Sequence, residues 1–220
     1  MIKKFLIPAH LCFLTLFAFG QEKEYQVGDH ELLLMPTAYT MPKGKSYFSD
    51  YELFLLNYSR AVTSRTHVGI FTLFPITEDF LKTVTLGLKQ NYFRSPKAES
   101  AFWLTFTPDI GSFTVGNVIS VGKRATSLHL GISAAFEAED DEKEFIFMVG
   151  FHAATSERVS FIFEYTNFSS FIEEDFNGLF SIGVRFRGDR MAWEIAGIRP
   201  LESSEGLLFF PLLKATVFFD

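Results

Sequence analysis

Three charged side chains interrupt otherwise apolar segments in the C-terminal part of the chain: Glu164, Arg185 and Glu194. The apolar residues around each of them alternate with polar ones, which predicts extended strands. On consecutive strands the three charges would point to the same face. Such a row forms either an ion-pair network that fixes strand register or, in a water-filled passage, a constriction that selects solutes by charge. Both roles stay open.

Two histidines, His129 and His152, are expected on this same face. A zinc site needs further ligands at defined spacing, and none accompanies them, so no metal site is predicted. Ser127, His129 and Glu137 have the residue types of a catalytic triad, but a single strand spreads them too far apart. Partners from neighbouring strands would be required. No catalytic residue is therefore predicted, and an enzyme acting on membrane lipid is kept as an alternative.

The overall composition excludes several other functions. A formal net charge of −6 disfavours nucleic-acid binding, which calls for a basic face. The sequence contains no phosphate-binding glycine loop, zinc motif or nucleophile elbow, so no cofactor is predicted.

The residues that position these side chains alternate with a period of two from about residue 50 to the end. Val84, Leu86 and Leu88 alternate with small or polar residues, and Phe145, Phe147, Val149 and Phe151 alternate with Ile146, Met148, Gly150 and His152. This pattern predicts strands with one apolar face. We expect twelve, with ten as the alternative count: 31–38, 46–59, 67–75, 80–93, 100–107, 113–121, 127–138, 145–154, 159–168, 179–187, 191–199 and 207–219. The fold class is an all-β, transmembrane, up-and-down antiparallel β-barrel.

The apolar face is expected to meet lipid. It is rich in Phe, which supplies 28 of 220 residues, and has no charge in mid-strand. The opposite face carries Gly, Ser and Thr, and packing so many Phe rings into one lumen would crowd it. A soluble lipocalin-like barrel, with the apolar face inward, is the alternative. Six residues are apolar on the polar face and indicate either a plug, formed by residues 21–30, or an apolar passage: Ile146, Met148, Ile162, Leu208, Phe210 and Leu212.

The first twenty residues have the features of a secretory signal peptide. Lys3 and Lys4 precede an apolar run, and Ala18 and Gly20 supply the small residues before a cleavage site. We expect a signal peptide at 1–20, a periplasmic segment at 21–30 and the barrel at 31–220. The single cysteine, Cys12, lies in the signal peptide, so the secreted chain would fold without disulfides.

The connections between the expected strands alternate in charge. One set is basic, as at Lys123-Arg124, and the interleaved set is acidic, as at Glu173-Glu174-Asp175. Alternate connections lie at the same rim of an up-and-down barrel, so one end would be acidic and the other basic. The final strand should end in the periplasm, which makes the acidic end extracellular. The basic turn at residues 42–45 is the exception, because this count places it at the acidic end.

Residues 35–38, 41–48 and 51–58 pair a Pro-Thr-Ala stretch with a Lys-Gly turn and an aromatic strand. This arrangement resembles uncharacterised outer-membrane β-barrel families of the Bacteroidetes type. The resemblance covers about 25 residues, implies a barrel in the outer membrane of a Gram-negative cell, and implies no catalytic residues. We therefore expect a non-catalytic, porin-like outer-membrane protein that forms a narrow pore or has a structural or surface role. Its partners would be outer-membrane lipids and, during insertion, the barrel assembly machinery.

Overall fold

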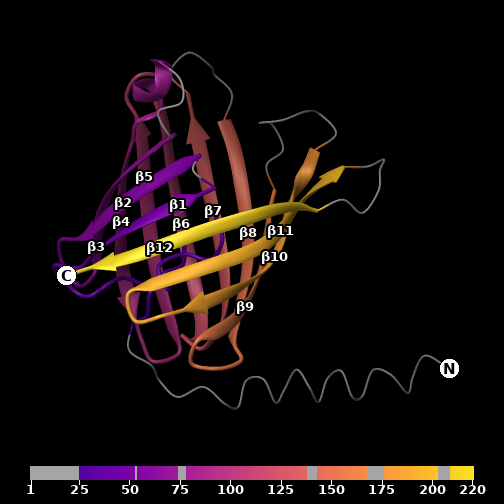
Figure 1. The fold of residues 1–220 in the computed structure, drawn as a ribbon. Helices are drawn as coiled ribbons and strands as arrows, with labels where there is room; N and C mark the ends of the chain where they lie inside the picture. Colours follow the sequence, from indigo (N-terminus) through magenta and orange to yellow (C-terminus); the bar gives the residue numbers. More distant parts are fainter. Residues whose placement is uncertain (1–24, 53, 74–77, 138–142, 168–175, 203–208) are drawn as a thin grey trace.

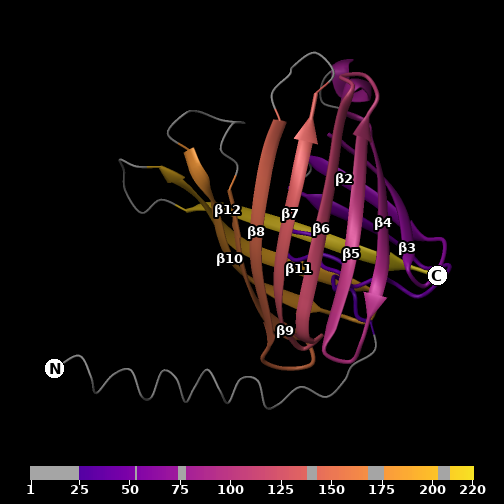
Figure 2. The ribbon, with the colours of Figure 1, turned by 180° about the vertical axis from the view of Figure 1, so that it is seen from behind.

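A computed structural model describes residues 25–220 except 53, 74–77, 138–142, 168–175 and 203–208. Its twelve strands close into one antiparallel barrel in which each strand pairs with its neighbours in sequence (Figures 1 and 2). They are β1 (Ser46–Tyr51), β2 (Leu55–Ala61), β3 (Thr66–Leu73), β4 (Thr85–Arg94), β5 (Ala98–Thr107), β6 (Ser112–Lys123), β7 (Thr126–Phe136), β8 (Lys143–Ala154), β9 (Val159–Thr166), β10 (Phe176–Arg187), β11 (Met191–Glu202) and β12 (Phe210–Phe219). A short 3-10 helix, η1 (Glu78–Thr83), precedes β4.

The barrel is closed by pairing its first and last strands. β1 runs antiparallel to β12 with Ser46 opposite Phe219 and Tyr51 opposite Lys214. Closure leaves no unpaired sheet edge, which satisfies the backbone along the wall. The predicted fold class is confirmed. Within the described residues no helix is long and apolar enough to cross a membrane.

The predicted strand count is correct because two errors cancel. Residues 31–38 do not form a strand of the barrel; a single isolated bridge joins Glu31 to Pro36. The predicted strand at 46–59 is instead the β1–β2 hairpin. Glu52 makes its turn with φ of 56°, and the backbone NH of Glu52 donates to the carbonyl of Leu213.

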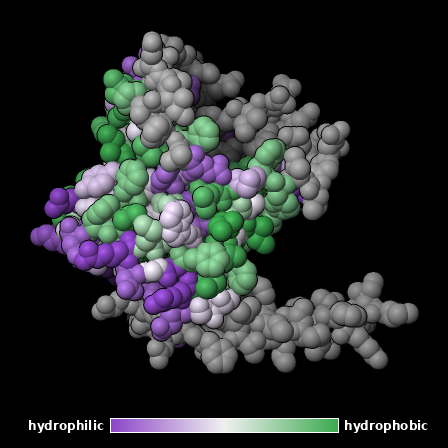
Figure 3. Space-filling view, viewed as in Figure 1, coloured by the Kyte–Doolittle hydropathy of each residue, from purple (hydrophilic) through white to green (hydrophobic). Residues whose placement is uncertain are grey.

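The wall alternates as the period of two predicts. On β7, Leu130 and Ile132 point outward and are 41% and 57% exposed, whereas Ser127 and His129 point into the barrel and are at most 1% exposed. Figure 3 shows apolar residues gathered over the strands above a lower edge of hydrophilic residues. The exposed apolar face is thus on the outside of the barrel.

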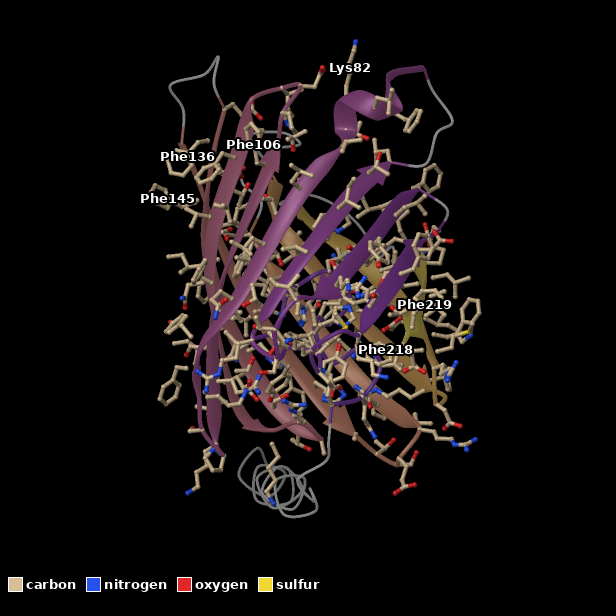
Figure 4. All side chains as sticks on the ribbon, turned by 90° about the vertical axis from the view of Figure 1, so that its left-hand side faces the viewer. Lys82, Phe106, Phe136, Phe145, Phe218 and Phe219 are labelled. Carbon is tan, nitrogen blue, oxygen red and sulfur yellow. The ribbon has the colours of Figure 1, made fainter. Side chains whose placement is uncertain are left out.

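Aromatic rings form a band on the outer surface near one rim. Phe106 lies opposite Phe113, which in turn lies opposite Phe136, with 6.1 Å between the ring centroids of the second pair. Phe145 projects outward close to them, whereas Phe219 lies lower, on the opposite side of the view (Figure 4). Such bands at both edges of an apolar belt are typical of barrels that sit in a bilayer.

The lumen holds residues 25–41, which we call the plug. Leu32, Leu33 and Met35 are at most 1% exposed and belong to one apolar cluster with side chains of the wall. That cluster contains four of the apolar lumen residues noted above, Ile146, Met148, Ile162 and Leu212, so their interpretation as plug contacts is confirmed. The plug extends further along the chain than the predicted 21–30, and Leu208 lies outside the described residues.

The plug also changes the assignment of the basic turn at 42–45. Because residues 31–38 are not a wall strand, this turn enters β1 from the same rim as the β2–β3 turn. The backbone NH of Gly44 donates to the carbonyl of Ala61, and Lys45 pairs with the side chain of Asp220. The turn therefore lies at the basic rim and the predicted exception disappears. β1 begins at this rim, and β12 ends there.

Candidate functional site

Glu164 is directed at the plug. It lies on β9, is 2% exposed, and its carboxyl oxygens accept hydrogen bonds from the backbone NH groups of Leu33, Leu34 and Met35 at 2.6–3.1 Å. Three converging NH groups in a bend form an anion-binding nest. Glu164 thus satisfies donors that the plug, lacking a strand partner there, cannot satisfy itself.

Arg185 and Glu194 form the ion pair that the predicted row contains. They lie opposite each other on β10 and β11, and Nε of Arg185 donates to Oε1 of Glu194 at 2.6 Å. The rest of the guanidinium is used by the plug, since its terminal nitrogens donate to the carbonyls of Gly28, Glu31 and Leu32 at 2.7–2.9 Å. The three predicted charges therefore share one face. Arg185 pairs with Glu194, whereas Glu164 binds the plug instead of pairing with Arg185.

Gly28 is required by this arrangement. Its φ is +87°, a conformation that side chains disfavour, and a Cβ atom there would lie 2.9 Å from Cζ of Arg185. The backbone of the plug can approach the guanidinium only because this side chain is absent.

Two lysines that were not singled out in the sequence complete the site. Nζ of Lys214, on β12, donates to the carbonyls of Leu32 and Leu33 and pairs with Glu31 at 2.8 Å. Nζ of Lys89, on β4, donates to the carbonyls of His30 and Tyr39 at 2.8 Å. The sequence did contain a signal for both lysines. Each is a charge in mid-strand on the face opposite the Phe side chains, and such a charge must point inward.

The plug contributes its own charged cluster. Glu31 accepts hydrogen bonds from Ser49 and Tyr51 and contacts His30, whose ring stacks on Tyr47 at 3.6 Å. Burial opposes ionisation of Glu31, but Lys214 and His30 outweigh it and hold its pKa well below the usual 4.5. Burial also lowers the pKa of His30 from 6.5, against the opposing effect of Glu31.

The two predicted lumen histidines both face inward but lie in separate hydrogen-bond groups. His129 is bonded through Nδ1 to Ser120 at 2.7 Å and through Nε2 to Ser127 at 2.9 Å. His152 shares a contact of 3.2 Å with Arg187. Ser127 and His129 are thus close enough to bond, but Glu137 lies beyond the far end of β7, so the three residues do not come together as a triad.

The described side chains offer little for metal or triad chemistry. No group of three or more His, Cys, Asp or Glu residues among them could hold a metal ion. His129 has hydroxyl partners at both ring nitrogens, so in the described structure no carboxylate orients it as a catalytic base.

The site as a whole is a set of wall charges that bind backbone. Glu164, Arg185, Lys214 and Lys89 contact NH or carbonyl groups of a segment that carries no regular secondary structure. In a barrel this arrangement can hold the lumen closed, because the segment lies across the lumen and its polar groups are bonded to the wall.

No protein-family model matches the chain, and no curated protein matches its sequence. Among solved structures, a triple mutant of the Rhodopseudomonas blastica porin is similar at 9% identity and a TM-score of 0.45, over 75% of this chain and 55% of the porin. The anion-selective porin from Comamonas acidovorans has 12% identity and a TM-score of 0.39, over 74% and 57%. This chain spans little more than half the length of these porins. LpxR from Salmonella typhimurium has 8% identity and a TM-score of 0.44, over 80% of this chain and 99% of LpxR.

Proposed function

We propose that this chain is a non-catalytic β-barrel of the Gram-negative outer membrane whose lumen is closed by its own N-terminal segment. Its role would be structural or at the cell surface, and a narrow pore would exist only when the plug leaves. The observation that carries the proposal is the binding of plug backbone by charged wall side chains, among them Glu164, Arg185, Lys214 and Lys89.

The membrane location is supported by the wall itself. Large apolar side chains cover the outside, rings cluster in a band near one rim, and the closed sheet leaves no unpaired edge in the described strands. Outer-membrane lipids and the barrel assembly machinery would be its partners. Membership of the Bacteroidetes-type family that residues 35–58 resemble belongs to the same proposal. The lipocalin-like alternative is disfavoured, because the inward face of the wall is polar and the lumen contains the plug.

Single-channel recording in planar bilayers tests the closed lumen. We expect the full chain to be silent and a variant lacking residues 25–40 to conduct steadily, because the charged groups of the wall would then face water. If the full chain conducts steadily with its plug in place, the proposal is wrong.

A disulfide keeps the test decisive if the deletion variant does not fold. The described plug packs so closely on β8 that a Cβ atom on Gly150 would lie 2.3 Å from Cδ1 of Leu32. In a chain carrying Leu32→Cys and Gly150→Cys, oxidation should abolish any transient opening and reduction should restore it. The single variant Leu32→Cys is the control. Openings that persist unchanged under oxidation would contradict closure by the plug.

A further inference from the structure

The lumen is not filled on the side of the plug that faces the acidic rim. A cavity of about 180 Å³ lies there between the plug and strands β1 to β5. Its lining includes Leu34 and Pro36 of the plug, and Phe71, Lys89, Trp103 and Thr105 of the wall. A dry cavity of about 150 Å³ is enough to hold benzene, so this one has room for a ligand with one aromatic ring.

The lining is mostly apolar and has an unusual exposed side chain. Leu34 is 38% exposed, whereas its neighbours Leu33 and Met35 are at most 1% exposed. The indole of Trp103 lies flat against the wall, since a Cβ atom on Gly116 would be 2.1 Å from its ring. The plug therefore presents an apolar surface to a space flanked by an aromatic ring.

A single cation gives the cavity its charge preference. Lys89 lines it and uses two of its three ammonium hydrogens on plug carbonyls, which leaves one N–H. Within the described residues no carboxylate lies at ion-pair distance from Lys89. Glu31 also reaches the cavity, but Lys214 neutralises it at 2.8 Å.

We propose that this cavity is a binding site for a small apolar carboxylate, whose ring packs between Leu34 and Trp103 while its carboxylate accepts the remaining N–H of Lys89. Entry is from the acidic rim, because the plug occupies the other end of the lumen. The charges of that rim slow the approach of an anion, but physiological salt screens them over about 8 Å. Lys89 lies four residues, about 13 Å, inside the start of β4.

Quenching of Trp103 fluorescence by 4-bromobenzoate tests the site. The chain has two tryptophans, and Trp193 points outward, so a Trp193→Phe background leaves Trp103 as the reporter. We expect saturable quenching by 4-bromobenzoate and about tenfold weaker binding of the uncharged 4-bromobenzamide, the difference a charge-assisted hydrogen bond supplies. Equal binding of the two compounds would overturn the proposal, because Lys89 would then recognise nothing.

A matched pair of wall variants separates the cavity from general uptake into the detergent or bilayer. Thr105→Phe fills the cavity and should abolish quenching, whereas Thr114→Phe, directly opposite on β6 and outside the lining, should leave it unchanged. Lys89→Met should reduce binding of the carboxylate to that of the amide. Quenching that survives Thr105→Phe would overturn the proposal.

Discussion

Individual buried charges in this barrel act on backbone more than on each other. Arg185 makes one ion pair and three hydrogen bonds to plug carbonyls, and Glu164 accepts only from plug NH groups in the described structure. A buried charge is costly unless its hydrogen-bonding capacity is satisfied. Removal of either side chain should therefore loosen the plug before it affects the pairing of the strands.

Glu164→Gln is the sharpest test at this scale. The amide would keep one acceptor but place an NH₂ group among three backbone donors, so the plug should lose about 1.5–3 kcal/mol of docking free energy. Faster hydrogen exchange of residues 33–35 at equal global stability would show this. Thr166→Val, the next inward position of β9, is the control and should leave exchange unchanged. Unaltered exchange in the Gln variant would mean that Glu164 does not hold the plug.

The plug is the element that the sequence predicted least well. Residues 31–38 alternate like a strand, yet their backbone groups are bonded by residues about 130 to 180 positions away, such as Glu164 and Lys214. No local pattern encodes such contacts. The β1–β2 turn was not predicted for a different reason. Residues 52–54 contain no Gly, Pro or Asn, the residue types that normally mark a hairpin turn. The wall was predictable because its alternation is local.

Acidification should weaken the contribution of His30 and Glu31 to plug docking. His30 and Glu31 both have lowered pKa values in the docked plug, so the undocked segment binds protons more readily. Their contribution to docking is complete above pH 6.5 and weakens as the pH falls below 6.5 through His30 and below 4.5 through Glu31. The slope approaches about 1.4 kcal/mol per pH unit for one proton. Hydrogen exchange of residues 25–41 from pH 7.5 to 4 measures it.

His30→Gln is the matched variant for this pH dependence. It should remove the step below pH 6.5 and keep the step below pH 4.5, because Glu31 retains Lys214. The ring of His30 also faces Tyr25 and Tyr47, neither of which titrates in this range. An upper step that persists in His30→Gln would assign it to another group.

The two rims of the barrel carry opposite charge, so the molecule has a charge polarity along the barrel axis. The turns at one rim are short and include the basic side chains of Arg65, Lys97 and Arg124, and the C-terminal end of β12 lies there too. The connections at the other rim include the acidic side chains of Glu52 and Asp109. Sequence alone predicted this polarity because the charges alternate connection by connection, and the plug resolves its one exception, since the turn at 42–45 now falls at the basic rim.

This axial polarity predicts the orientation of the barrel in the membrane. Lys97 and Asp109 are exposed residues at the two ends of β5, about 33 Å apart along ten residues of strand. In a Cys12→Ser background, an impermeant maleimide should label Asp109→Cys on intact cells but label Lys97→Cys only after the outer membrane is permeabilised. The two variants share one strand and differ only in its end, so each controls for the folding of the other. The reverse labelling would place the acidic rim in the periplasm, and the cavity above the plug would then open inward.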